Sequence, residues 1–213
     1  MYTVSTSRKK YHHEDLRTAL LREGMALVAE KGGHQWSLRE LARRLDVSAM
    51  APYRHFADKE ALLTAIAADG YRQLWARLET AEKAPRPTHT PLLQQGIAYV
   101  RFALDCPALF RLMFSMKIPE GRSAELDTAR AAAFDVLMRS IQTAGSADAP
   151  NVKAMGCWSL VHGLSLLLLD DMLHMPEDAD PEAWLAQVIG DTVAGVHDTT
   201  QYHHPGGLMH HKE

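Results

Sequence analysis

The stretch LDVSAMAPYRHFADKE, residues 45–60, has a proline at its centre and three polar or aromatic residues directly after it. Ser48 is a good helix N-cap, so we predict a short helix from Ser48 to about Phe56. Pro52 lies near the start of that helix, where a proline removes only an early hydrogen bond. Three consecutive helical residues span about 200 degrees around the axis. At least two of these three must therefore face outward: Tyr53, Arg54 and His55.

Two further helices precede this stretch. Apolar residues at helical spacing predict a helix from about His13 to Lys31, and a double glycine follows as a stop signal. Ser37, with Glu40 three residues later, forms a capping-box pattern that begins a second helix of about eight residues. A tight turn at Asp46-Val47 follows. This order predicts a helix-turn-helix, whose second element fits a DNA major groove about 12 Å wide.

The outward residues suit DNA chemically. Tyrosine and histidine are compact hydrogen-bonding groups for phosphate oxygens, and Arg54 can also reach guanine. Lys59 adds a cation in the first turn of the next helix, where backbone N–H groups already favour an anion. Ser37 and Arg39 begin the helix that abuts the DNA backbone. Residue chemistry alone leaves a solvated helix face without a partner as the alternative.

The sequence WSLRELARRLDVSAMAPYRHFADKEALL, residues 36–63, resembles the TetR family of transcriptional repressors. The similarity is strongest in Tyr53-x-His55-Phe56 and Asp58-Lys59-Glu60-x-Leu62, and it extends over residues 13–65. Pro52 stands where the family more commonly has leucine. The resemblance implies DNA-backbone contacts from Tyr53, His55 and Lys59. It also implies that six residues approach the bases: Arg39, Ser48, Ala49, Met50, Ala51 and Arg54.

The rest of the chain is predicted to be helical. Asp58 caps a helix that continues to about Lys83 and ends at the proline-rich APRPTHTP, residues 84–91. Further helices are predicted at about 91–105, 107–115, 122–144, 150–174 and 181–199. We therefore predict an all-α fold of about nine helices. The expected domains are a DNA-binding domain with a disordered arm at 1–58, a helical effector-binding and dimerisation domain at 59–200, and a disordered tail at 201–213.

Trp158 and His162 share a helix face, so both could line a ligand cavity in which the imidazole orients an otherwise apolar ligand. The alternative is a hydrogen-bonded core histidine beside a packing tryptophan. Trp158-x-x-x-His162-Gly163 and CPALFRLMF, residues 106–114, resemble a C-terminal subgroup of the TetR family. That resemblance implies an effector-binding and dimerisation domain. Four apolar residues join the two as candidate cavity residues: Phe102, Phe110, Met113 and Phe114.

Charge is unevenly distributed along the chain. Residues 1–60 carry a net charge of +3 and the remainder carries −6, which favours DNA binding at the N-terminal end. The uncharged stretch 154–169 is shorter than the about 18 to 20 residues that span a bilayer. We therefore predict a helix buried on most sides and no membrane association. Two scattered cysteines and the lack of a secretory signal fit a reducing cytoplasm.

Common catalytic motifs are missing from the sequence, including H-E-x-x-H, G-x-S-x-G, G-x-x-x-x-G-K and C-x-x-C. We expect no enzymatic activity, no cofactor and no metal site. The first hypothesis is a homodimeric repressor that binds a palindromic double-stranded operator and responds to a small-molecule effector. Its dimer would form through the helices at about 150–174 and 181–199. The second hypothesis is a small-molecule-binding helical protein or enzyme without operator binding.

Overall fold

The structure, a computed structural model, describes residues 13–33, 35–84, 89–115, 121, 123–143 and 150–195. These residues form helices and no strand, which confirms the predicted all-α fold. Eight elements are α-helices and one, η1, is a single 3₁₀ turn: α1 (His13–Lys31), α2 (Leu38–Arg44), η1 (Pro52–Arg54), α3 (Lys59–Lys83), α4 (Pro91–Asp105), α5 (Pro107–Ser115), α6 (Ala124–Thr143), α7 (Pro150–Leu169) and α8 (Pro181–Gly195). The predicted disordered arm and tail, and the predicted continuation of α8 to 199, fall on residues outside the described ranges.

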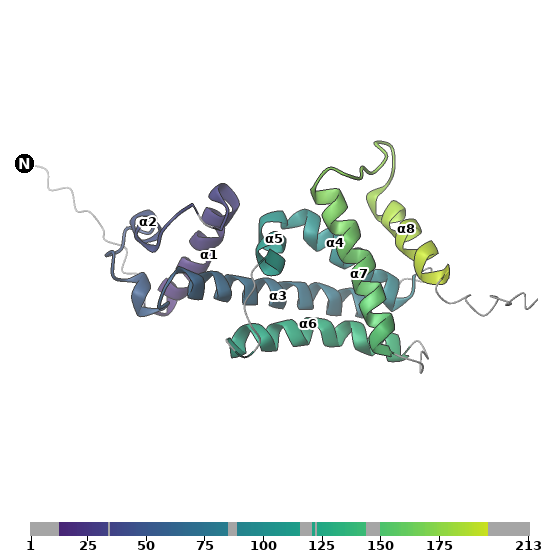
Figure 1. The fold of residues 1–213 in the computed structure, drawn as a ribbon, viewed down its shortest axis with the longest axis horizontal. Coiled ribbons are helices and arrows are strands. Elements are labelled where there is room, and N and C mark those ends of the chain that lie inside the picture. The colour runs from purple at the N-terminus through teal and green to yellow at the C-terminus, as the bar shows by residue number, and fades with distance from the viewer. Residues whose placement is uncertain are drawn as a thin grey trace, which may run out of the picture.

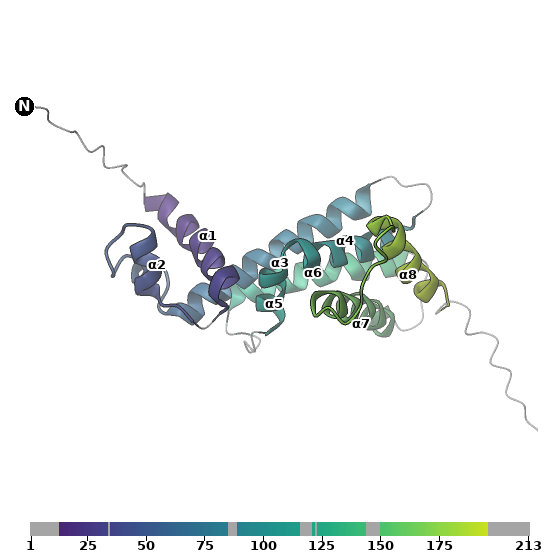
Figure 2. The ribbon, with the colours of Figure 1, turned by 90° about the horizontal axis from the view of Figure 1, so that it is seen from above.

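α3 connects the two ends of the molecule (Figure 1). Asp58 caps it by accepting a hydrogen bond from the Ala61 N–H at 2.8 Å. Its 25 residues extend for about 37 Å. α1, α2 and η1 lie at its N-terminal end and are called the head; α4 to α8 pack around the rest and are called the body (Figure 2). Buried apolar side chains continue from the head into the body, so the two share one core.

The turn after α2 is built by the backbone. The Val47 N–H reaches back to the Ala42 carbonyl at 3.0 Å, and the Asp46 N–H bonds to the Arg43 carbonyl at 3.2 Å. These two bonds define a Schellman motif, which needs a left-handed residue after the helix. Asp46 supplies it with φ of 52°, a conformation that aspartate tolerates better than most residues. The predicted Asp46-Val47 turn is therefore present.

The predicted third helix from Ser48 to Phe56 is wrong. Only η1 is helical there, and it is flanked by turns. Pro52 has no N–H to give to the Ser48 carbonyl, and its ring crowds that carbonyl in an α-helix. The Ser48 carbonyl instead accepts from the Ala51 N–H at 2.9 Å, and the Pro52 carbonyl accepts from the His55 N–H at 3.0 Å. The proline thus shortens the second element of the helix-turn-helix to about one turn.

α6 lies antiparallel to α3 along the body, and ion pairs join both ends of the two helices. Arg72 bonds to Glu125 at 3.0 Å near the start of α6, and Arg139 bonds to Glu79 at 3.1 Å near its end. α4 packs on the other side of α3 and is covered by α7 and α8. The body is therefore a layered helical bundle with α3 and α4 inside it.

α7 departs from the prediction in two ways. It ends at Leu169 instead of about 174, because Asp171 adopts a left-handed φ of 53° and the Met172 N–H turns back to the Leu167 carbonyl at 2.9 Å. With 20 residues it has the length and composition of a membrane-spanning helix, although in the body it packs on α4 and α6. The expectation of burial on most sides is wrong, since only five of its residues are buried: Ala154, Val161, Leu164, Ser165 and Leu168.

Candidate nucleic-acid interface and ligand cavity

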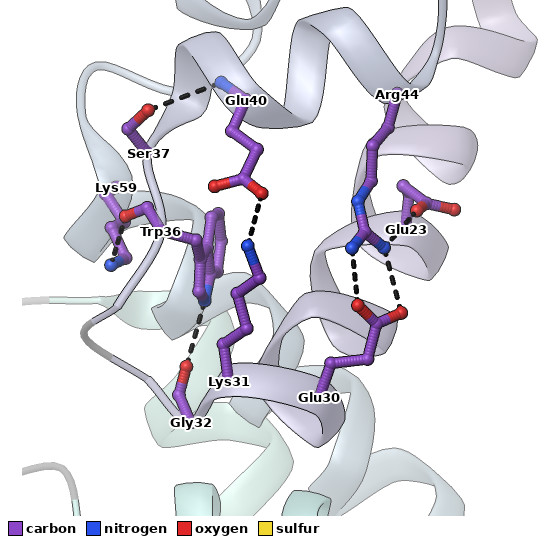
Figure 3. A network of polar contacts seen from close by, with 9 residues as sticks. All are labelled: Glu23, Glu30, Lys31, Gly32, Trp36, Ser37, Glu40, Arg44 and Lys59. Atoms are coloured by element: carbon purple, nitrogen blue, oxygen red, sulfur yellow. Dashed lines mark hydrogen bonds and ion pairs between the residues drawn. The ribbon is translucent and has the colours of Figure 1, made fainter.

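Ion pairs hold α2 against α1 in the head (Figure 3). Arg44 forms a two-pronged pair with Glu30 and also contacts Glu23 at 3.1 Å. Lys31 pairs with Glu40 at 2.6 Å. Hydrogen bonds from Arg44 and Lys31 lower the pKa values of Glu30 and Glu40, respectively. The orientation of α2, and of the residues that it presents outward, is therefore set by charges on α1.

Lys59 points inward at the start of α3 (Figure 3). Its ammonium donates to the Trp36 carbonyl at 2.7 Å and lies 4.5 Å from the centre of the Trp36 ring, and burial lowers the pKa of Lys59. The Trp36 indole in turn donates to the Gly32 carbonyl at 3.0 Å. The next residue, Ser37, caps α2 by accepting from the Glu40 N–H at 3.3 Å. Lys59 thus fixes the residue that precedes the α2 cap, a role that sequence reasoning missed.

The other residues predicted to contact DNA differ in exposure. Met50 is 65% exposed, Tyr53 is 42% exposed and His55 is partly buried. Ala51 is only 8% exposed and faces the core beside Pro52, so its methyl group cannot reach a base. The exposed members of the predicted set come from the start of α2 and from the segment that ends with η1: Ser37, Arg39, Ser48, Ala49, Met50, Tyr53 and Arg54.

The body contains a cavity of about 540 Å³ between α3, α4, α6 and α7. This volume is in the range of small-molecule sites. Three of the predicted ligand residues line it: Met113, Phe114 and Trp158. The other three do not border it: Phe102, Phe110 and His162. Phe102 and Phe110 are fully buried in the core, and His162 packs on Phe114 with ring centres 4.5 Å apart.

A hydrogen-bonded row of aromatic side chains forms one wall of the cavity. The Trp158 indole donates to the Tyr99 hydroxyl at 3.2 Å, and that hydroxyl lies 2.9 Å from His162 Nδ1. Burial raises the pKa of Tyr99 and lowers the pKa of His162, so both groups are held in their neutral forms. His162 therefore matches the core-histidine alternative more closely than the ligand-orienting role, because its ring braces Tyr99 and Trp158 from behind.

Sequence reasoning missed the polar residues of the cavity. Gln95 comes from α4, and Asp127 and Arg130 come from the first turns of α6, where they pair at 3.8 Å. The signal for Gln95 was an amide within the apolar segment PLLQQGIAYV, since a buried amide needs partners. Within the described residues, no three His, Cys, Asp or Glu side chains gather as a metal site requires.

Two family profiles match the chain. The one for bacterial regulatory proteins of the tetR family covers residues 20–66, and the one for the tetracyclin repressor-like C-terminal domain covers residues 92–191. A protein with unknown function from Rhodococcus sp. RHA1 has a solved structure with 31% sequence identity and a TM-score of 0.74. The match covers 88% of this chain and 98% of that chain. The chain belongs to the TetR family.

Other TetR structures share the fold at lower identity. A bacterial regulatory protein in the tetR family from Rhodococcus RHA1 is 22% identical with a TM-score of 0.62, over 84% of this chain and 95% of that one. The TetR family transcriptional regulator PfmR from Thermus thermophilus is 22% identical with a TM-score of 0.59, over 82% and 96%. No curated protein matches the chain. The TetR profiles at both ends identify a DNA-binding transcriptional regulator with a helical C-terminal domain.

Proposed function

We propose that this TetR-family regulator is a cytoplasmic, homodimeric repressor whose binding to a palindromic operator is controlled by a small molecule in the body cavity. One observation carries the proposal: the same helix, α3, begins beside the exposed residues of the head and continues as a wall of the cavity. We also propose that the chain belongs to the C-terminal subgroup with the Trp-x-x-x-His-Gly sequence. Here that sequence supplies the Trp158 and His162 of the aromatic wall.

The DNA side of the proposal rests on the exposed residues around η1. Tyr53 and His55 offer hydrogen bonds to phosphate oxygens, and Arg54 can bond to the edge of guanine in the major groove. The turn before η1 would carry Ser48, Ala49 and Met50 toward the bases, and Ser37 and Arg39 would meet the backbone at the start of α2. Ala51 is left out because it is buried. Lys59 supports the surface through Trp36.

The dimer is proposed to form through α7 and α8. The exposed positions of α7 recur at helical spacing, so they lie on one face. Val152 is 71% exposed, and a β-carbon added to Gly163 would meet no atom within 4 Å. Apolar stripes of this kind mark interfaces, and a two-fold dimer pairs the same surface on both subunits. The stripe consists of small and apolar residues: Val152, Met155, Gly156, Ser159, Gly163 and Leu167.

Ligand control requires contacts that connect the cavity to the head. Asp127 lines the cavity near the start of α6. Two residues earlier, Glu125 bonds to Arg17 of α1 at 3.4 Å and to Arg72 of α3 at 3.0 Å. A ligand that displaces the first turn of α6 would therefore also displace a contact on α1. The resulting change in DNA affinity is limited by the preference of the ligand for one arrangement over the other.

Selection of binding sites from a random duplex pool tests this function. We expect the purified protein to enrich a palindrome with half-sites about one helical turn, or 34 to 36 Å, apart. The combined Tyr53→Ala and Arg54→Ala variant should bind that sequence at least about 10-fold more weakly. Arg101→Ala is the matched control, because Arg101 is an exposed arginine on α4 in the body. It should bind as the wild type does.

The outcomes separate the parts of the proposal. If no sequence is enriched, operator binding is contradicted and the small-molecule-binding protein without an operator is favoured. If the enriched sequence lacks two-fold symmetry, the dimeric reader is contradicted. If Arg101→Ala weakens binding as much as the double variant does, the head is not the surface that contacts DNA.

A further inference from the structure

Gln95 places a hydrogen-bond acceptor without a partner on the cavity wall. The residue is only 3% exposed, and it lines the cavity from α4. Its amide Nε2 donates to the Ser140 hydroxyl on α6 at 2.7 Å, whereas its Oε1 is buried and has no hydrogen-bond partner among the described residues. A buried polar atom without a partner costs free energy, so this oxygen is a point where a bound molecule gains affinity by donating.

The orientation of this amide follows from its neighbours. The Ser140 hydroxyl has a single proton, which it directs to the Glu82 carboxylate at 3.5 Å. The hydroxyl oxygen can therefore only accept from Gln95, which puts the Nε2 of Gln95 toward Ser140 and leaves Oε1 facing the cavity. Glu82 is itself held by Arg139 at 3.3 Å. The acceptor at Gln95 is thus fixed by a chain of hydrogen bonds and not by the choice of an amide rotamer alone.

A second acceptor lies toward the opposite end of α6. Asp127 Oδ1 is buried at the cavity wall and has no hydrogen-bond partner among the described residues, although it is ion-paired with Arg130. The separation of Asp127 and Ser140 along α6 is 13 residues, or about 20 Å. The cavity follows α6 between these levels, since Arg130, Phe134 and Leu137 also line it. Its long axis therefore runs along this helix, with one acceptor toward each end.

The charges on the cavity wall cancel. Asp127 and Arg130 are the charged side chains among the described lining residues, and they lie 3.8 Å from each other. An ionic ligand would lose its hydration without meeting a counterion of its own, which is costly in an apolar site. Aliphatic and aromatic side chains cover most of the remaining wall, including Leu74, Phe114 and Val161.

We propose that the cavity binds an elongated, uncharged and largely apolar molecule that donates a hydrogen bond, from a hydroxyl or an N–H group, to the Oε1 of Gln95. The class follows from the two acceptors without partners, the cancelled charges and the length of the cavity along α6. This inference rests on the proposed function, because it names the chemical class of the ligand at that site.

Four probes of similar length and different head groups test the class. Isothermal titration calorimetry on the purified full-length protein would compare 1-decanol, methyl nonanoate, decanoate and decylammonium. Methyl nonanoate can only accept a hydrogen bond, decanoate is an anion and decylammonium is a cation. We expect 1-decanol to bind about 10-fold more tightly than methyl nonanoate, because only the alcohol can satisfy Gln95. Both ions should bind at least about 10-fold more weakly than the alcohol.

Two glutamine variants locate the effect. Gln95→Leu should bring the ratio of 1-decanol to methyl nonanoate affinity close to one, because the acceptor is removed and an apolar side chain of similar size remains. Gln94→Leu is the matched control. Gln94 is also a buried glutamine of α4, but it borders a different cavity beside Ala81 and Ala84. Gln94→Leu should keep the wild-type ratio, and it reports any general effect of losing a buried amide from this helix.

The outcomes also distinguish this inference from the proposed function. If an ion binds most tightly, or if Gln95→Leu keeps the wild-type ratio, the ligand class is wrong. If none of the four probes binds, the inference is overturned as well. In each case the selection of operator DNA and its loss in the head variant remain an independent test. If the alcohol binds as expected but no operator is found, the cavity is a ligand site and the regulator function fails instead.

Discussion

The Met113 sulfur lies 2.6 Å from the position that a β-carbon on Gly70 would occupy. Leu109 approaches the same point to 2.9 Å. α5 can therefore cross α3 this closely only because α3 has a glycine there. Met113 also lines the cavity, so the packing at Gly70 sets the position of a cavity residue. A change on one side of α3 is thereby transmitted to the ligand site.

Gly70→Ala should destabilise the protein despite the better helix propensity of alanine. The propensity gain is about 1 kcal/mol, whereas overpacking of a core contact costs about 1 to 3 kcal/mol. We expect a lower free energy of unfolding in urea, partly restored when Met113→Ala is added. Gly190→Ala is the control, because the nearest atom to its β-carbon would be at 3.8 Å. Equal stability of the two alanine variants would contradict the close contact.

Lys59→Ala and Arg39→Ala should weaken DNA binding for different reasons. Lys59 holds Trp36 at the start of α2, so its loss misplaces the surface without removing a phosphate contact. Arg39 is exposed on α2 and is proposed to neutralise a phosphate. The slope of log K against log salt concentration should fall by about one for Arg39→Ala and stay unchanged for Lys59→Ala. Fluorescence anisotropy between low and moderate salt measures both slopes, and the reverse pattern would refute the inward role of Lys59.

Charge on the exposed face of α7 should separate the proposed dimer. Met155→Glu together with Leu167→Glu places two carboxylates on the apolar stripe, and in a two-fold dimer each would face a desolvated surface. We expect the dissociation constant of the dimer to rise at least about 100-fold, with folding retained. Sedimentation velocity measures the change. Met50→Glu is the control, because Met50 is also exposed but lies in the head. A monomeric Met50→Glu variant, or an unaffected α7 variant, would refute this interface.

Stability should fall as the pH is lowered through about 6.5, the ordinary pKa of histidine. Burial lowers the pKa of His162, so the unfolded chain takes up a proton at a pH where the folded protein still keeps the ring neutral. Protonation thus favours the unfolded state, and the loss of stability levels off below the folded pKa. His162→Gln should lose less stability than the wild type between about pH 7.5 and 5.5 in urea titrations. His174→Gln, at an exposed histidine, should follow the wild type.

Helix boundaries were predictable where the backbone signal is local. Ser37 and Asp58 cap α2 and α3 as expected, and Pro91, Pro107, Pro150 and Pro181 begin four helices. The third helix was not predicted correctly, because the effect of Pro52 depends on which carbonyl its missing N–H would have served. The end of α7 was also missed, since Asp171 adopts a left-handed conformation that usually signals glycine.

The cavity was less predictable than the head. The residues around η1 are close in sequence, so one short pattern brings them together. The polar residues of the cavity come from α4 and α6, and only tertiary packing places Gln95 beside Ser140. His162 illustrates the same limit from the other side: its spacing from Trp158 was read correctly as one face, but Phe110 and Phe114 enclose the ring from a different helix.

The cavity has no dedicated lining, because Leu74, Leu78, Val161 and Ile189 border it and also belong to the buried core. A substitution that adapts the site to a new effector therefore also alters the packing that keeps the protein folded. Descendants of this regulator can change effectors readily only when earlier mutations have raised their stability. The less disruptive route is at Gln95 and Asp127, where a polar group can be exchanged while the packed volume stays nearly the same.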